Sequence, residues 1–376
     1  MPRCRHYLWA MEQAMEPTLT FSRDAADARA SEPKLRIVDD KTMLRAAADL
    51  TRDLSAPRPA LYWGDLIASA VVGYGALVAA VLAPSTALMV VAAAVSVLAL
   101  YRALLFIHEV SHMKHAALPG FRLGWNLIAG IPMMVPSFMY EGVHNLHHAK
   151  TRYGTADDPE YLPLALMKPW TLPVFILVSL LAPIGLLIRF AILSPLSWLS
   201  PKLRDLVIAR YSSLSINPSF RRRIPAGEQR VLFDRLDAAA SVWAIGLLAM
   251  VATGVIPMRG FLIGLGIGSA VALLNQVRTL VAHLWENEGE QMTVTAQYLD
   301  SVNVPPPGLL PALWAPVGLR YHALHHLLPS LPYHALGEAH RRLSEVLEQE
   351  SPYHKASYRS ALGLMHRIGR STMVRR

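Results

Sequence analysis

The sequence predicts an all-α, multi-pass integral membrane protein, and three observations lead to this fold class. The 376 residues are 53% hydrophobic and only 17% charged, whereas soluble domains carry about 25% charged residues. Four apolar runs each approach the ~20 residues that a membrane-spanning helix requires. Nine of the 15 histidines form three clusters and one single position, at the ends of these runs or in the polar segments that follow them.

The four apolar runs are paired in two tight hairpins. Runs 66–83 and 87–107 are separated by Pro84-Ser85-Thr86, and runs 238–256 and 260–282 by Pro257-Met258-Arg259. Basic residues gather on the other side of the runs, and the positive-inside rule places that side in the cytosol. We therefore expect four transmembrane helices, with both short turns outside.

Two further apolar stretches are interrupted. Stretch 123–140 contains Pro132 and Pro136, and stretch 171–193 contains two prolines and Arg189. One extra crossing would separate the early histidines from the late ones. We therefore expect both stretches to form interfacial or re-entrant helices, which membranes tolerate when protein covers them; a spanning helix at 171–193 is the alternative.

Composition and flanks limit the remaining possibilities. We expect a cytosolic tail at 1–60, a membrane domain with a cytosolic helical cap at 61–345, and a basic tail at 346–376. Met11 and Met15 are alternative starts within the first tail.

Cys4 is the single cysteine, which excludes an intramolecular disulfide or a Cys-ligated metal site. A net charge of +9 beside apolar runs suits an anionic membrane surface, and nothing indicates nucleic-acid binding.

Three histidine clusters and one single histidine carry the chemistry. Positions i, i+3 and i+4 share a helix face, so each cluster can direct its imidazoles to one point. Under the expected topology all four elements lie on the cytosolic side. The nine candidate metal ligands and catalytic residues are His108 and His112 in HEVSH; His144, His147 and His148 in HNLHH; His322, His325 and His326 in HALHH; and His283.

Neutral imidazole binds first-row metals such as iron, copper and zinc. Nine imidazoles exceed what one ion can hold, so the sequence predicts two metal ions. Metal-bound histidines usually have a carboxylate to orient them. The nearby acids are Glu109, Glu141, Asp157, Asp158 and Asp300. His115, one turn beyond His112, is expected to support the site or the substrate rather than bind metal.

With these motifs, the sequence resembles the membrane-bound fatty acid desaturase family over roughly residues 60–345. HEVSH, HNLHH and HALHH are similar to its three histidine boxes, and the stretches TADDPEY at 155–161 and HLLPSLPY at 326–333 also match. The boxes identify the superfamily rather than the reaction, because related hydroxylases and ketolases have similar ones.

The resemblance implies a mushroom-shaped helical fold whose cytosolic cap holds two irons. It also implies that dioxygen is activated with two external electrons and that two hydrogens are removed from an unactivated acyl chain. His283 resembles the isolated ligand after the fourth span. Some members place an Asn one turn before it, where this chain has Thr279. A third box that begins with His322 rather than Gln weakly disfavours desaturation near the carboxyl end of the chain.

From the resemblance we expect a fatty acyl-lipid desaturase, with a related lipid hydroxylase or ketolase as the alternative. The flanks are short and show no flavin, haem or iron–sulfur motif, so an external ferredoxin-like or cytochrome-type donor is expected. Arg221, Arg222, Arg223, Arg230 and Arg235 would attract such a donor or anionic lipids. A membrane zinc protease would leave two of the boxes unexplained. A metal transporter would instead place its ligands at mid-membrane.

Overall fold

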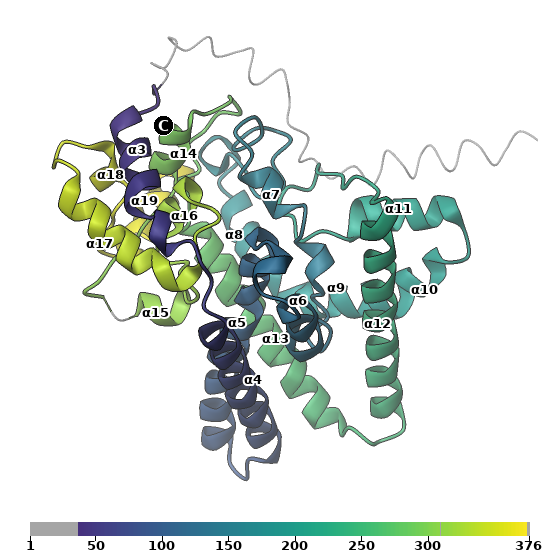
Figure 1. Cartoon of the computed structure of the whole chain (residues 1–376). Coiled ribbons are helices and arrows are strands. Elements are labelled where there is room, and N and C mark those ends of the chain that lie inside the picture. Colours follow the sequence, from purple (N-terminus) through teal and green to yellow (C-terminus); the bar gives the residue numbers. More distant parts are fainter. Residues whose placement is uncertain (1–36, 309, 374–376) are drawn as a thin grey trace, which may run out of the picture.

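The computed structural model describes residues 37–308 and 310–373 and consists mainly of helices (Figure 1). Within these residues no strand forms, and three isolated β-bridges join extended segments. Long helices form a stem, and short helices with long loops form a cap at one end of it (Figure 1). The predicted all-α membrane fold is confirmed.

The first hairpin consists of α4 (Pro59–Leu82) and α5 (Thr86–His112). The Ser85 side chain caps α5 by accepting a hydrogen bond from a backbone N–H of its first turn. The two helices approach closely at Gly73, where a Cβ would lie 2.6 Å from a side-chain carbon of Leu100. This packing brings the C-terminal end of α5, with both HEVSH histidines, to the base of the cap.

The second hairpin consists of α12 (Gly227–Ala252) and α13 (Met258–Leu280). α13 packs against α4 and α5, whereas α12 lies farther from them (Figure 1). At the tip, the Arg259 side chain donates a hydrogen bond to the Ala83 carbonyl, which ties the two hairpin turns together. All four predicted spans are long, apolar helices.

Residues 171–197 form a fifth segment that is long and apolar enough to cross a membrane. Its regular parts are α8 (Thr171–Leu177), α9 (Ala182–Ile188) and α10 (Ser194–Ser197), joined by a 3-10 turn and a π-helical turn. The sequence predicts that this segment lies in the interface or is re-entrant.

The contacts of this segment differ from those of a helix that crosses from one side to the other. Near its start, Phe175 packs on Trp285, which follows the cap-side end of α13. In the middle of α13, the Ser269 hydroxyl donates a hydrogen bond to a carbonyl of the segment. Near its end, Arg189 bonds to Asp237 in the N-terminal half of α12. Both ends therefore lie beside cap-side parts of the stem, as a re-entrant segment requires.

Arg189 is buried in this apolar segment because it belongs to a charge cluster. Its guanidinium donates to Asp237 at 2.9 Å, and Arg204 of α11 (Pro201–Tyr211) donates to the same carboxylate at 2.5 Å. Asp237 is fully buried. Removing one partner of such a buried pair is strongly destabilising, because it leaves an uncompensated charge. The cluster thus holds the segment against α11 and α12.

The other interrupted stretch, 123–140, is divided into short pieces. α6 (Phe121–Trp125) continues as a π-helical turn at 126–130, and a 3-10 turn follows at 137–139. The Trp125 indole donates to the Ala103 carbonyl of α5, and Asn126 bonds to Ser137 across the break. None of these pieces is long enough to cross a membrane, as expected.

The cap packs around short helices that carry two of the histidine clusters. Its helices are α3 (Lys41–Leu50), α7 (His144–His147), α14 (Val294–Asp300), α15 (Pro311–Trp314), α16 (His322–Leu327), α17 (Leu336–Val346), α18 (Pro352–Lys355) and α19 (Ala361–Met373). Buried residues of α3 and α19 belong to the apolar clusters of the cap. Parts of both predicted tails therefore pack on the cap, while 1–36, with the alternative starts, lies outside the described residues.

The re-entrant topology can be tested with single cysteines in a Cys4→Ser background. Lys168 and Lys202 are exposed and flank the fifth segment, and Thr86 is exposed at a hairpin tip. We expect a membrane-impermeant maleimide to label K168C and K202C from the same side of sealed vesicles and T86C from the other side. All three should react after solubilisation. Labelling of K168C and K202C from opposite sides would mean that the segment crosses.

Candidate metal centre and the cavity beside it

The nine predicted histidines meet at the junction of stem and cap and form two groups. Within each group the candidate ligand nitrogens all lie within 4.8 Å of one another. One group contains His108, His112, His144, His148 and His325, and the other contains His147, His283, His322 and His326. Each group is large enough to hold one metal ion.

Each HxxHH cluster supplies both groups. His144 and His148 are four residues apart and point to the first group, whereas His147 points to the second. Neighbouring residues on a helix diverge by about 100°, so the adjacent His147 and His148 face different groups. The two groups therefore lie side by side.

The spacing of the imidazole nitrogens fits metal coordination. Nε2 atoms of His112 and His148 lie 3.1 Å and 3.2 Å from that of His325, and those of His147 and His322 lie 3.3 Å and 3.0 Å from that of His283. Imidazole nitrogens bind a metal at ~2.0–2.1 Å, and ligands at that radius are roughly 3.0–3.4 Å apart. Both groups thus fit a bound ion.

Burial prepares these imidazoles for metal. It holds the pKa of most of them outside the spans well below the usual value of histidine, so they are neutral near pH 7. Neutral imidazole is the form that coordinates a metal. The residues with a lowered pKa are His144, His148, His283, His322, His325 and His326.

Carboxylates orient the histidines of the second box. His147 Nδ1 lies 2.9 Å from a carboxylate oxygen of the fully buried Asp158, and His144 Nδ1 lies 2.8 Å from Glu160. Burial alone would lower the pKa of His147, but the nearby carboxylates of Asp158, Glu160 and Asp300 together outweigh it and raise that pKa. Asp158 also accepts the backbone N–H of Gly154. These bonds fix each ring with Nε2 directed into its group.

A tyrosine orients His283. Its Nδ1 lies 2.9 Å from the Tyr153 hydroxyl, and that hydroxyl also bonds to Asp300 at 2.7 Å. Burial raises the pKa of Asp300 to about 6, although the hydrogen bonds from Tyr153 and Tyr161 oppose the shift. The isolated histidine is therefore oriented through Nδ1, like His144 and His147 of the second box.

Of the five acids that the sequence suggested, Asp158 and Asp300 serve the metal groups. Glu141 instead contacts His115, and Asp157 is exposed. Glu109 accepts hydrogen bonds from the Tyr62 hydroxyl and the Tyr333 backbone N–H, and its carboxylate lies 3.8 Å from the nearest His108 nitrogen. It is thus engaged rather than free to act as the base of a zinc protease.

Sequence reasoning missed two supporting residues and misjudged a third. Glu160 and Tyr153 were not singled out, although Glu160 lies in the quoted stretch after the second box. His115, expected beside the site, has a side chain that is 43% exposed and lies 3.2 Å from Glu141 at the surface. Spacing alone could not show this, because α5 ends at His112.

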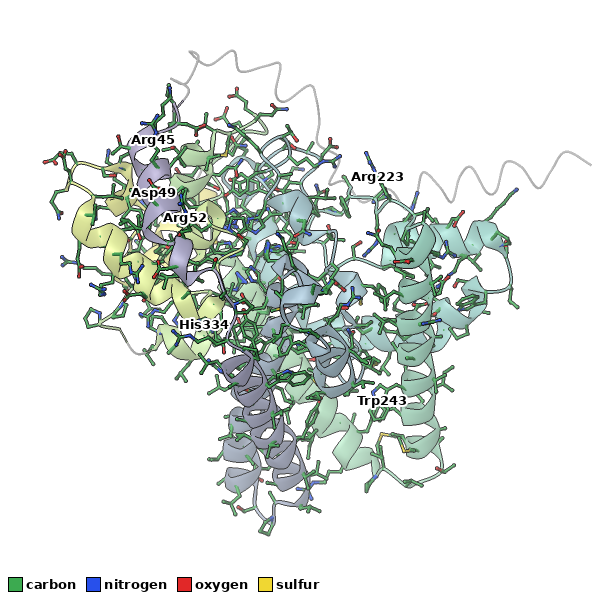
Figure 2. All side chains as sticks on the ribbon, in the orientation of Figure 1. Arg45, Asp49, Arg52, Arg223, Trp243 and His334 are labelled. Carbon is green, nitrogen blue, oxygen red and sulfur yellow. The ribbon has the colours of Figure 1, made fainter. Side chains whose placement is uncertain are left out.

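The basic run at 221–223 is less uniform than its charge suggests. Arg222 is partly buried and donates to backbone carbonyls of Phe138, Ser212 and Glu141, so it holds loops together. Arg221 bonds to carbonyls of its own loop. Arg223 is exposed near the cap-side end of α12 (Figure 2). The predicted five-arginine docking surface is therefore wrong for Arg222.

A large cavity of about 1100 Å³ opens beside the metal groups. Its wall includes His108, His147, His283 and His322 at one end, and apolar residues of α4 and α13 along its length. Trp243 of α12, labelled in Figure 2, also lines it and donates a hydrogen bond to the carbonyl of Pro132, another lining residue. The metal centre therefore faces an elongated, mostly apolar space.

Comparison with known proteins identifies the family. A family model described as fatty acid desaturase matches residues 84–360. The chain belongs to this family. A protein of Caulobacter vibrioides (strain NA1000 / CB15N) named ceramide hydroxylase is 52% identical over 322 residues, which cover 86% of this chain and 92% of that protein. The predicted family membership is thus confirmed, and the name of this relative suits the hydroxylase alternative better than the desaturase.

Two adjacent aspartates give a matched test of the metal centre. Asp158→Asn weakens the hold on His147, so we expect metal affinity to fall about tenfold to a hundredfold. Asp157→Asn changes an exposed neighbour and should leave the affinity unchanged. The measurement is iron per chain after dialysis against graded chelator. Equal retention in both variants would contradict a metal-supporting role of Asp158.

Proposed function

We propose that this chain is a di-iron membrane hydroxylase that acts on ceramide or a closely related N-acylated sphingoid lipid. The observation that carries the proposal is its 52% identity, over nearly the whole length of both chains, to a protein named ceramide hydroxylase. Two converging histidine groups beside a long apolar cavity support it. Desaturation of an acyl chain, which the resemblance to the fatty acid desaturase family led us to expect, is the competing reaction.

The histidines would hold one iron in each group. Bound there, two irons would supply dioxygen activation and the oxidising power that no side chain offers for an unactivated C–H bond. The balanced hydroxylation consumes O2, two electrons and two protons; one oxygen atom enters the C–H bond and the other leaves as water. The chain itself keeps Nε2 atoms converging through Asp158, Glu160 and Tyr153.

The cavity suits the tails of a membrane lipid. α13 lines it from Gly260 to Thr279, roughly 28 Å at ~1.5 Å per residue, which is close to the hydrocarbon thickness of a bilayer. Gly264 leaves width here, because a Cβ at this position would meet no atom within 4 Å, whereas Gly268 lets α13 pack closely on Pro183. Tails lying here would direct the headgroup end of the lipid toward the metal centre.

Electrons would come from an external ferredoxin-like or cytochrome-type donor, and the cap would face the cytosol. Both proposals rest on the basic residues of the cap side, including the exposed Arg223 and Arg235. Anionic lipid headgroups are the alternative partner of the same charges.

The function is tested by mass spectrometry of lipids from a ceramide-containing host that expresses the chain under isotopically heavy dioxygen. We expect ceramide to gain one heavy oxygen atom. His147→Ala, which removes a proposed ligand, should reduce the product at least ~100-fold. Loss of two hydrogens without added oxygen would identify a desaturase, and oxidation of other lipids alone would overturn the substrate.

Two glycines of α13 test the role of the cavity. A Cβ at Gly264 or at Gly266 would meet no atom within 4 Å, but only Gly264 lines the cavity, whereas Gly266 is exposed on the outer face. We expect Gly264→Phe to lower turnover of long-chain lipid about tenfold or more and to shift preference to shorter chains. Gly266→Phe should behave as wild type. Chain-length profiles of the products provide the measurement, and similar profiles for both variants would contradict the assignment.

A further inference from the structure

Arg278 is a buried arginine in the wall of the cavity, at the metal end. It lies in the last turn of α13 and is 7% exposed. His108, His283 and His322 share the same wall, and Arg278 is close enough to act electrostatically on all three. The guanidinium therefore borders the space that a lipid must enter to reach the metal centre.

Arg278 lacks the partner that the other buried arginines have. Arg189 and Arg204 both bond to Asp237, but among the ion pairs of the described residues none includes Arg278. Its Nε is buried and has no hydrogen-bond partner in the described chain. A buried charged group in this condition is costly unless a ligand completes its hydrogen bonds.

The nearby side chains meet this need only in part. The Tyr101 hydroxyl is within hydrogen-bonding reach of the guanidinium and itself donates to the Trp314 carbonyl at 3.0 Å, so it can accept only a small share of the five N–H donors of Arg278. Glu160 attracts Arg278 at longer range, but its carboxylate bonds to His144 and Tyr140. Arg278 thus keeps hydrogen-bond donors for another acceptor.

Helix geometry places a second polar residue beside it. Asn275 and Arg278 are at i and i+3, so they share a face of α13, and both line the cavity. Farther along the same wall are Gly268 and Gly264, beside the apolar length of the cavity. This wall therefore has a polar end next to the metal groups and an apolar remainder.

A guanidinium only donates hydrogen bonds, so its ligand must offer an acceptor oxygen. We propose that Arg278, with Asn275 beside it, binds the amide carbonyl of an N-acylated sphingoid lipid and thereby directs oxygen insertion to a carbon within a few bonds of the amide. This inference rests on the proposed function and adds to it the group recognised and the position oxidised. Arg278 is then a specificity-determining residue, while the tails occupy the apolar length.

The test compares ceramide with its N-thioacyl analogue, in which the weaker acceptor sulfur replaces the carbonyl oxygen. Both are given to the iron-loaded wild type, to Arg278→Met and to Arg278→Lys. We expect wild type to prefer the oxo-amide about tenfold to a hundredfold in kcat/KM, the range of a hydrogen bond to a charged group. Arg278→Met should lose most of this preference, mainly through KM, and its products should spread over several carbon positions.

Anaerobic binding of both lipids gives a readout independent of turnover, through the fluorescence of Trp243 and Trp170 in the cavity wall. Iron per chain shows whether each variant keeps its metal centre. If the Arg278→Met variant loses iron, the comparison is made with Arg278→Lys instead. This variant keeps the positive charge and should retain part of the preference for the oxo-amide.

An unchanged oxo-to-thio ratio and an unchanged product position in the iron-replete variants would overturn the inference. Wild type would then still hydroxylate ceramide, so the proposed function would survive. If wild type neither binds nor oxidises either lipid but oxidises another class, the proposed function fails instead. The two failures are therefore distinguishable.

Discussion

The convergence of nine imidazoles on one small volume is the constraint on which the rest of the structure depends. Nitrogen lone pairs that meet at 3.0–3.3 Å do not attract each other without a cation between them. The protein must therefore hold the rings in place. Asp158, Glu160 and Tyr153 do so for three of them through Nδ1. Packing holds others, such as His148, His322 and His326, whose buried Nδ1 atoms have no hydrogen-bond partner among the described residues, and burial keeps most rings neutral and ready for metal.

This constraint explains the position of the helix ends. α5 must end with His108 and His112 at the cap, and α13 must end shortly before His283, so both hairpins have the same orientation. The fifth segment packs near its start on Trp285 and bonds near its end to Asp237 in the N-terminal half of α12; a re-entrant course would leave all the clusters on the same face. The stem thus serves as an anchor that presents ligands at its cap-side end, with an apolar cavity leading to them.

Much of this could be predicted from the sequence because it depends on local periodicity. Runs of apolar residues define the four spans, and the i, i+3, i+4 spacing of the boxes identifies the nine histidines. The division of His147 and His148 between two groups could not be read from that spacing, because it depends on where α5, α13 and α16 place the remaining histidines. Arg222 was assigned to a docking surface for a similar reason, since only the folded loops reveal the carbonyls that it binds.

The reaction itself lies beyond what the metal ligands can encode. Hydroxylation and desaturation require the same histidine ligands for the metal. They differ in how the carbon that is oxidised and its neighbouring carbon are positioned relative to the metal centre. That positioning is set by the cavity wall, where α13 changes from glycines to Asn275 and Arg278 as it nears the metal groups. If the polar headgroup of the lipid binds at the metal end of this wall, the neighbouring carbon atoms are held in a nearly fixed position relative to the metal centre. Specificity in this protein is therefore expected to reside in the face of α13 rather than in the histidine boxes.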